Sequence, residues 1–369
     1  MSSRLRFLLS GPGLIGRQHA KLLIAHPDCS LSAIAAPPRD RNKTFALECG
    51  AAFFSTFDEA LESGAFDAVI ISPPNSFHYD QAAACIRKGL PVFVEKPITD
   101  GLDSARRLVD LSERAEVPVL VGHHRTYSPL LDSARAFLAS TRFGRPVALQ
   151  GSALFYKPAQ YFKEGAWRTK KGGGPILINL IHEIGLMRLF FGEIDSVFAM
   201  PSHSVRGFEV EDTAAIALNF TNGALGTFIL SDTAASSKSW EMTAGENPAY
   251  PHFPEDACYH FAGTNGSLDF PSMRVRYYRN PAEASWWAPF ESAQLPLSRA
   301  NPLERQLDHF VDVVRRRAPP RVSARDGYLN MLVVEAIMRS MQQRRVVEIH
   351  DATDRGLANN RAYAKPTAN

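Results

Sequence analysis

Apolar residues in the first third of the chain alternate between short continuous runs and runs with helical spacing. The strand-like runs are 5–10, 31–35, 68–72, 91–95 and 117–121. The helix-like runs between them are 14–25, 41–48, 77–88 and 102–115. This alternation predicts a parallel sheet wound with helices on both faces. We expect Thr99 to cap the last helix and Gly89 to end the one before it.

The pattern changes after about residue 122, where strands follow one another. Their runs are 147–155, 197–200, 213–220, 225–230, 259–262 and 274–278. Asn222-Gly223 predicts a hairpin between two of them, and residues 263–266 predict another turn. The succession therefore favours a largely antiparallel second sheet.

Helices in this second part are expected at four places. Ser128-Pro129 and Asn301-Pro302 are typical helix starts. Asp326 is expected to cap a helix through Ile337. A further run over 175–191 is apolar on nearly all sides. From residue 351 the sequence is polar without periodicity, which is typical of a tail.

Length and composition restrict the class of protein. A chain of 369 residues favours two domains. Its net charge of +3 gives no reason to expect nucleic acid as a partner, and no apolar run reaches membrane-spanning length. The 4 cysteines form no CxxC pair, so we expect reduced thiols, a cytoplasmic protein and no structural metal.

A glycine-rich loop joins the first strand to the first helix. Gly11 permits a tight turn, Gly13 lets the backbone approach a pyrophosphate, and Gly16 permits close packing of helix on strand. Leu14 and Ile15 begin the helix, whose amino terminus favours phosphate. This context predicts dinucleotide binding; the alternative is a purely structural turn.

The end of the second strand bears on the choice of cofactor. NAD-binding sheets usually place there an acid that binds the ribose 2′-hydroxyl, but this chain has Ala36. Arg39 and Arg41 follow and suit a 2′-phosphate. They are equally typical of a solvated loop, so NAD and NADP both stay open and we favour NADP.

The motif Glu95-Lys96-Pro97 ends a later strand of the same predicted sheet. A lysine there can polarise a substrate oxygen or hold a hydroxyl during hydride transfer. The alternative is a charged strand end followed by a turn. We expect Lys96 to lie where the reactive end of the dinucleotide reaches.

The ordered motifs resemble the glucose–fructose oxidoreductase, inositol dehydrogenase and rhizopine catabolism (Gfo/Idh/MocA) family. They are Gly-Pro-Gly-Leu-Ile-Gly-Arg-Gln-His-Ala (11–20), Ser-Pro-Pro-Asn-Ser-Phe-His (72–78), Glu-Lys-Pro (95–97), Gly-His-His-Arg (122–125), Trp-Arg (167–168) and the glycines 172–174 with His182. The series spans most of residues 5–345.

The resemblance implies an α/β architecture. A Rossmann dinucleotide-binding domain would occupy residues 1–124, with its doubly wound parallel sheet. A C-terminal α+β domain with a large, mostly antiparallel open sheet would occupy 125–350, ahead of the tail at 351–369. In similar proteins that sheet often forms oligomer contacts, so we expect a homodimer or homotetramer, a small-molecule substrate and no membrane partner.

The resemblance also implies roles for residues. Ser72, Pro74, Asn75 and His78 would line the middle of the cofactor, and Glu95 would hold the nicotinamide ribose. Further residues near the nicotinamide end would be Arg125, Trp167 and Arg168. Lys96 would meet substrate and nicotinamide, with His182 as the acid–base residue. Substrate contacts are expected from Lys96, Tyr156, Asn179 and His182.

The chain departs from the family pattern around His182. Many relatives carry Asp or Asn four residues earlier and Asp three residues later, where this chain has Ile178 and Gly185. Either Asn179 orients His182, or the proton route differs, or His182 is a buried structural histidine. The adjacent His123 and His124 are expected to point to opposite sides, as on an extended segment.

Three functions are therefore considered. The first is an NAD(P)-dependent oxidoreductase for a secondary alcohol or carbonyl of a sugar, polyol or related acid. The second is a dinucleotide-binding regulator without chemistry. The third is a glycoside hydrolase or lyase that uses NAD for transient oxidation. The intact Glu95-Lys96-Pro97 motif favours the first.

Overall fold

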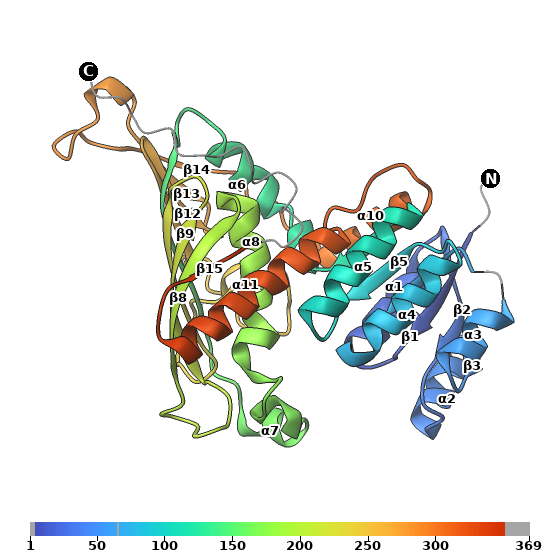
Figure 1. Cartoon of the computed structure of the whole chain (residues 1–369). Coiled ribbons are helices and arrows are strands. Elements are labelled where there is room, and N and C mark those ends of the chain that lie inside the picture. Colours follow the sequence, from blue (N-terminus) through green and yellow to red (C-terminus); the bar gives the residue numbers. More distant parts are fainter. Residues whose placement is uncertain (1–3, 65, 351–369) are drawn as a thin grey trace.

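Two sheets organise the chain in the computed structural model, which describes residues 4–64 and 66–350 (Figure 1). The first sheet has six strands, all parallel, in the order β3-β2-β1-β4-β5-β6. Its strands are β1 (Leu5–Ser10), β2 (Cys29–Ala35), β3 (Ala52–Phe54), β4 (Ala68–Ile71), β5 (Val92–Glu95) and β6 (Val119–Gly122). This order is that of a Rossmann domain, as expected.

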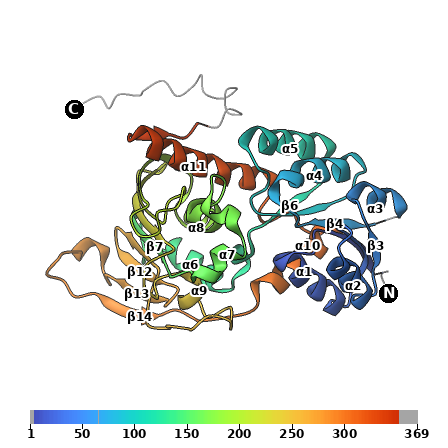
Figure 2. The same ribbon diagram turned by 90° about the horizontal axis from the view of Figure 1, so that it is seen from below.

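Helices cover both faces of this first sheet (Figure 2). They are α1 (Leu14–Ala25), α2 (Asp40–Glu48), α3 (Phe57–Ser63), α4 (His78–Arg87) and α5 (Leu102–Ala115), with short turns η1 (Asn75–Phe77) and η2 (His124–Tyr127). Two of these helices, α1 and α5, have the predicted bounds. Gly89, with φ of 73°, follows the end of α4 as predicted.

The second sheet has nine strands in the order β14-β13-β12-β11-β7-β10-β9-β8-β15. They are β7 (Pro146–Leu154), β8 (Ile194–Ser202), β9 (Thr213–Phe220), β10 (Leu225–Ser231), β11 (Tyr259–Gly263), β12 (Gly266–Phe270), β13 (Arg274–Tyr277), β14 (Glu291–Gln294) and β15 (Val347–Glu348). All neighbouring pairs are antiparallel except β7 and β10. The mostly antiparallel second sheet is therefore confirmed, as is the hairpin at Asn222-Gly223.

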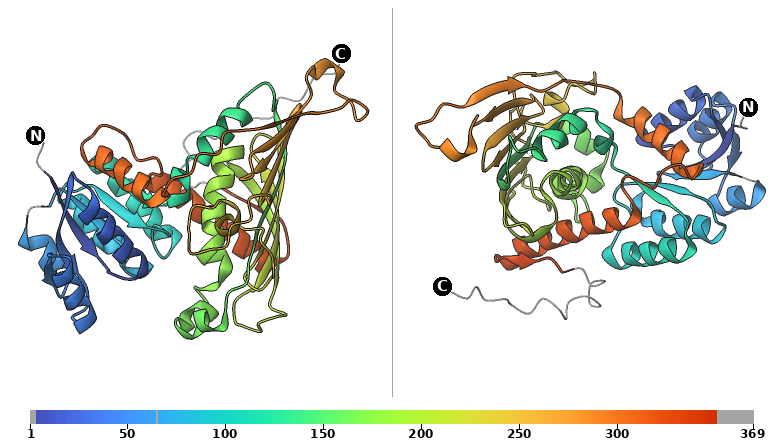
Figure 3. Two further views of the ribbon diagram at one scale, coloured as in Figure 1. Left: turned by 180° about the vertical axis from the view of Figure 1, so that it is seen from behind. Right: turned by 90° about the horizontal axis from the view of Figure 1, so that it is seen from above.

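Most helices of the second part lie on one side of this sheet, and the helix that begins at Pro302 lies on the first sheet instead (Figure 3). The helices of this part are α6 (Leu130–Leu138), α7 (Ala159–Lys163), α8 (Ile181–Phe191), α9 (Trp240–Thr243), α10 (Pro302–Val314) and α11 (Ala324–Gln343), with turns η3 (Ala166–Thr169), η4 (Ile176–Leu180) and η5 (Pro281–Glu283). Among the described residues, no helix covers the opposite face of the sheet (Figure 1).

Helix α10 lies late in the sequence but packs on the first sheet. Phe310 is fully buried, with its ring 6.0 Å from that of Phe7 and 5.6 Å from that of Phe93. Leu307 and Val311 join the same apolar cluster. The sequence pattern changes near residue 124. The hydrophobic core of the first sheet nevertheless also includes residues of α10, from near the end of the chain.

Two expected helix caps were wrong. Helix α5 has Gly101 as its N-cap, and the Thr99 hydroxyl donates to the Gly101 carbonyl at 2.8 Å. Helix α11 is capped by Ser323, and Asp326 is its reciprocal partner in a capping box. The helix also runs past Ile337 to Gln343 because buried residues continue along it.

Several short elements were not predicted, among them β3, α3 and the edge strand β14. The polar tail predicted from residue 351 lies outside the described residues. Within the described residues, no helix is both long and apolar enough to cross a membrane. The 4 cysteines are free thiols.

Candidate active site

The glycine loop forms a tight cradle between β1 and α1. Gly11 has φ of 79°, and a Cβ there would lie 2.4 Å from the Pro73 nitrogen. A Cβ at Gly16 would lie 2.2 Å from the Gly11 carbonyl oxygen, so both positions require glycine. A Cβ at Gly13 would meet nothing within 4 Å. The helix leaves the first-turn amides, including those of Leu14 and Ile15, without intrahelical acceptors. The loop thus has the open, donor-rich geometry that a pyrophosphate requires.

The loop after β4 closes one side of this cradle. The Ser72 hydroxyl donates to the carbonyls of Ser10 and Gly11, at 2.9 and 2.8 Å. Pro74 and Asn75 are exposed beside it. His78 is buried, with its two ring nitrogens 2.9 Å from the carbonyl oxygens of Pro73 and Pro97. His78 therefore ties the cofactor loop to the loop that carries Lys96.

The end of β2 has no carboxylate that could bind a ribose hydroxyl. Ala36 is buried, and its N–H donates to the Phe54 carbonyl at 3.1 Å. Arg39 is the N-cap of α2 and Arg41 lies in its first turn, and both side chains are exposed. This edge can accept negative charge.

Glu95 is enclosed at the end of β5. One carboxylate oxygen lies 2.8 Å from Nε2 of His19, on α1, and the other accepts from the Lys96 N–H at 3.2 Å. Burial opposes the charge, but His19 and Lys96 outweigh it and hold the pKa of Glu95 below its usual range. Glu95 thus fixes the start of the lysine loop to the nucleotide-binding helix.

Lys96 reaches from the first domain to the second. Its Nζ donates to the carbonyl of Ile178 at 3.1 Å, and the Lys96-Pro97 peptide is cis. Burial lowers the pKa of Lys96, and the charge of Arg125 lowers it further against the opposing effect of Glu95. A lysine in this environment gives up a proton more readily than one in water.

Ile178 accepts this bond through its backbone. Residues Ile176–Leu180 form a π-helical turn directly before α8. The widened turn presents the Ile178 carbonyl to Lys96, so a side-chain acceptor at position 178 is not needed to hold the lysine. This accounts for one departure from the family pattern.

His182 begins the first turn of α8 and is almost fully buried. Its ring lies 5.7 Å from that of His123 and 5.3 Å from that of His124, centroid to centroid. Burial first, and then the charges of Lys96 and Arg125, hold its pKa well below the usual range. Its Nδ1 has no hydrogen-bond partner among the described residues. These surroundings favour the neutral form of the His182 ring.

The expectation that His123 and His124 point apart was wrong. His124 begins the short helix η2, so the backbone is not extended there and both rings contact His182. Among the described residues, no group of His, Cys, Asp or Glu has the geometry to hold a metal ion.

Asn179 is engaged away from His182. Its Oδ1 accepts from Nζ of Lys157 at 2.7 Å, and the same Nζ lies 3.6 Å from a carboxylate oxygen of Asp232. Burial, opposed by Asp232, lowers the pKa of Lys157 to about 8. Asn179 thus holds Lys157, and the neighbouring residue Ile178 holds Lys96.

Arg125 occupies a buried ionic network. It donates to Glu183 and Glu241, and the Tyr259 hydroxyl donates to the other oxygen of Glu183. Its guanidinium also lies 5.5 Å from the Trp240 ring. The guanidinium is therefore fixed by protein groups beside Lys96 and His182.

The remaining predicted residues lie around Lys157. Arg168 stacks on Tyr161 at 3.8 Å, and Nζ of Lys157 lies 4.9 Å from the same ring. Trp167 and Tyr156 are more than half exposed, at 57% and 62%. The structure thus brings Arg168 to the second lysine, while Trp167 and Tyr156 lie at the surface.

Sequence reasoning missed His19 and Lys157. His19 lies within the quoted glycine motif, where a helical position facing β5 was its only signal. Lys157 follows a strand, as Lys96 does, and this shared placement could have indicated it. No local signal marked Glu241 or Tyr259, which reach the site from distant segments.

Two family profiles match almost the whole described chain. "Oxidoreductase family, NAD-binding Rossmann fold" covers residues 5–123, and "Oxidoreductase family, C-terminal alpha/beta domain" covers 135–349. The fold and the site therefore define an NAD-binding oxidoreductase. The chain belongs to the Gfo/Idh/MocA family.

Characterised relatives are similar over nearly their full length. The chain is 26% identical to scyllo-inositol 2-dehydrogenase (NAD(+)) of Bacillus subtilis, covering 95% of this chain and 97% of the relative. It is 25% identical to 1,5-anhydro-D-fructose reductase of Ensifer adhaerens, covering 93% and 98%. Both relatives are named as enzymes that oxidise or reduce polyol or sugar substrates.

Solved structures share the fold. The WlbA dehydrogenase from Bordetella pertussis, in complex with NADH and UDP-GlcNAcA, superposes with a TM-score of 0.76 at 21% identity, covering 94% of this chain and 99% of that one. An oxidoreductase from Agrobacterium radiobacter, in complex with NAD+, L-tartaric acid and magnesium, gives 0.77 at 20% identity, covering 94% and 99%.

Proposed function

We propose that this protein is an NAD(P)-dependent dehydrogenase or reductase that transfers hydride between nicotinamide and a secondary alcohol or carbonyl of a sugar, polyol or related acid. One observation carries the proposal. The Nζ of Lys96, from the nucleotide-binding sheet, is bonded at 3.1 Å to Ile178, four residues before His182. The two groups that this chemistry requires thus come together from different domains.

The bound nicotinamide would supply the hydride acceptor or donor. Lys96 holds the reacting oxygen of the substrate, and its lowered pKa suits it to share a proton with that oxygen. His182 is neutral and takes the hydroxyl proton during oxidation, or returns it during reduction. His182 is almost fully buried and Lys96 is partly buried, which limits the access of competing water to the reacting oxygen.

Cofactor binding is assigned mainly to residues 1–124, with further contacts from the second domain at the nicotinamide end. Gly11, Gly13, Leu14, Ile15 and Gly16 form the pyrophosphate cradle. The middle of the cofactor meets Ser72, Pro74, Asn75 and His78, and its nicotinamide end meets Glu95, Lys96, Arg125, Trp167 and Arg168. NADP is favoured over NAD because Ala36 stands where an acid would bind the ribose hydroxyl and the exposed Arg39 and Arg41 follow it.

Substrate binding is assigned to residues 125–350. Asn179 and Tyr156 are proposed to contact the substrate beside Lys96 and His182. The uncovered face of the second sheet is proposed to join copies of the chain into a homodimer or homotetramer (Figure 1). The protein is proposed to work in the cytoplasm.

The test is a panel of polyols, aldoses and sugar acids, each assayed with NAD+ and NADP+ by absorbance of the reduced cofactor. We expect stoichiometric reduced cofactor with at least one substrate, and tighter binding of NADP+ by calorimetry. Turnover without net reduction indicates a hydrolase or lyase instead. Cofactor binding without turnover on any substrate indicates a regulator.

A further inference from the structure

Asn330 of α11 fills the space beside Gly185, one turn after His182 on α8. A Cβ on Gly185 would lie 3.1 Å from Nδ2 of Asn330, so a larger side chain at this position would press on the amide. Asn330 is almost fully buried. The second departure from the family pattern, Gly185, thus admits a polar side chain from another helix.

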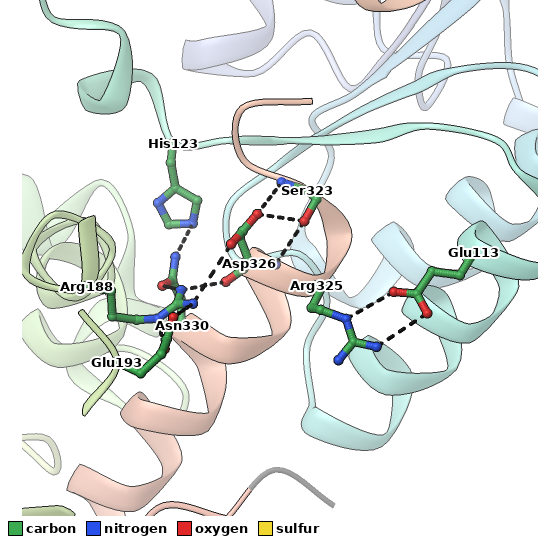
Figure 4. A network of polar contacts seen from close by, with 8 residues as sticks. All are labelled: Glu113, His123, Arg188, Glu193, Ser323, Arg325, Asp326 and Asn330. Atoms are coloured by element: carbon green, nitrogen blue, oxygen red, sulfur yellow. Dashed lines mark hydrogen bonds and ion pairs between the residues drawn. The ribbon is translucent and has the colours of Figure 1, made fainter. Parts of the chain in front are cut away.

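The orientation of the Asn330 amide is fixed by Arg188. A guanidinium has only donors, so the atom that faces it at 2.5 Å must be the amide oxygen. Arg188 is itself held by Glu193, at 2.7 and 2.8 Å (Figure 4). The Asn330 Nδ2 therefore faces away from Arg188, toward Nε2 of His123 at 3.3 Å.

This arrangement fixes the protonation of His123. Since the amide nitrogen donates, Nε2 of His123 must accept, and the ring proton of the neutral imidazole lies on Nδ1. Nδ1 of His123 is buried and has no hydrogen-bond partner among the described residues, so it is unpaired in either tautomer. A proton on Nε2 would in addition set two donors against each other. The tautomer follows from a continuous series of bonds that begins at Glu193.

The surroundings also oppose a charge on His123. Burial and the charge of Lys96 lower its pKa to about 3. The titratable and charged groups that face it are Glu95, Lys96, His124, His182, Arg188, Glu193, Arg321 and Asp326. A cavity of about 260 Å³ lies beside Asn330 and is lined by Arg188, Arg321 and Asp326.

We propose that Asn330 is a positioning residue that keeps His123 neutral with its proton on Nδ1, and so keeps a further positive charge away from His182 and Lys96 during turnover. The tautomer stands on hydrogen bonding alone, while its effect on turnover rests on the proposed function. A carboxylate at position 330 would reverse the hydrogen bond and stabilise a charged His123.

The first measurement uses the unmodified protein. Two-dimensional ¹⁵N NMR of histidine-labelled protein, with His123 assigned through His123→Gln, reports which ring nitrogen carries the proton. We expect the Nδ1–H form, without titration down to about pH 5. An Nε2–H form, or titration between pH 5 and 8, overturns the proposal. This result does not depend on any enzymatic activity, so it is separate from failure of the proposed function.

The second measurement compares Asn330→Asp with Asn301→Asp, which adds the same charge at the exposed cap of α10, where Asn301 bonds to Leu303 and Glu304. In Asn330→Asp we expect the Nε2–H form, titration of His123 between pH 5 and 8, and a new acid limb in kcat/KM. The activity at pH 6 should fall about tenfold relative to pH 8.5. Asn301→Asp should keep the original profile. Parallel pH profiles for Asn330→Asp and the unmodified enzyme contradict the proposal.

Discussion

Lys96 and His182 meet at the centre of the site, yet their surroundings differ. Lys96 follows a buried strand, is preceded by the enclosed Glu95, and donates to a fixed carbonyl. His182 has an unpartnered Nδ1 and lies against two other histidine rings. The lysine is thus held by hydrogen bonds, and the histidine mainly by packing.

The difference shows how much of each environment is local in sequence. The surroundings of Lys96 come from β5, from the glycine motif that carries His19, and from the π-helical turn at Ile176–Leu180. The histidine side depends on β6, α8 and α11, which lie far apart in the chain. A short motif can therefore identify the lysine, whereas the proton route depends on contacts that only the fold brings together.

Replacing the lysine should give the largest effect. Lys96→Met retains the apolar stem but removes the charge that holds the reacting oxygen, so we expect kcat to fall by about 10³-fold. Steady-state turnover on a confirmed substrate measures it. Lys88→Met, at an exposed ion pair with Glu62, is the matched control and should retain full activity. Undiminished turnover by Lys96→Met removes the lysine from the mechanism.

Replacing the histidine should cost less, because Lys96 would still hold the reacting oxygen. We expect His182→Gln to lower kcat by about 10²-fold and to flatten the acid limb of the pH profile. His260→Gln, on β11 of the second sheet where His260 pairs with Asp269 of β12, serves as the control. A loss below about threefold would leave His182 as a structural histidine, the alternative that the sequence left open.

A substitution at Asn179 tests whether this residue supports Lys157 or His182. Asn179→Ala removes the acceptor of Lys157, so we expect a loss of about 1–2 kcal/mol in the free energy of unfolding. The acid limb of kcat/KM should stay at the same pH, because Asn179 does not bond His182. Denaturant unfolding and a pH–rate profile measure the two effects. A moved acid limb would restore Asn179 as the partner of the histidine.

Lys157 should have the smallest effect on turnover, and its effect on stability should change with pH only above about pH 8. Its pKa is 10.5 in the unfolded chain and about 8 in the folded protein, so the unfolded chain binds more protons between these values. The stability of the unmodified protein relative to Lys157→Met should therefore rise from pH 8 to about 10. Parallel unfolding free energies across this range would show that the pKa of Lys157 is not lowered.

Sequence patterns predicted those strands and helices whose bounds depend on neighbouring residues in the chain. β1, α1 and α5 have the predicted bounds because each has a clear apolar period and flanking glycines or polar residues. The strand β3 is only 3 residues long, and the exposed β14 has a single apolar residue, Ala293, so neither shows a period. The ionic network of Arg125 could not be predicted, since its carboxylates come from α8 and α9 and no spacing links them.

The position of α10 has a consequence for biosynthesis. The ribosome finishes the sixth strand of the first sheet about 180 residues before it begins α10, which supplies Phe310 to the core of that sheet. At about 5–20 residues per second, this is a delay on the order of 10 to 40 s. During translation the nascent first domain exposes the apolar surface around Phe7 and Phe93, and it becomes complete only when the last helices leave the ribosome.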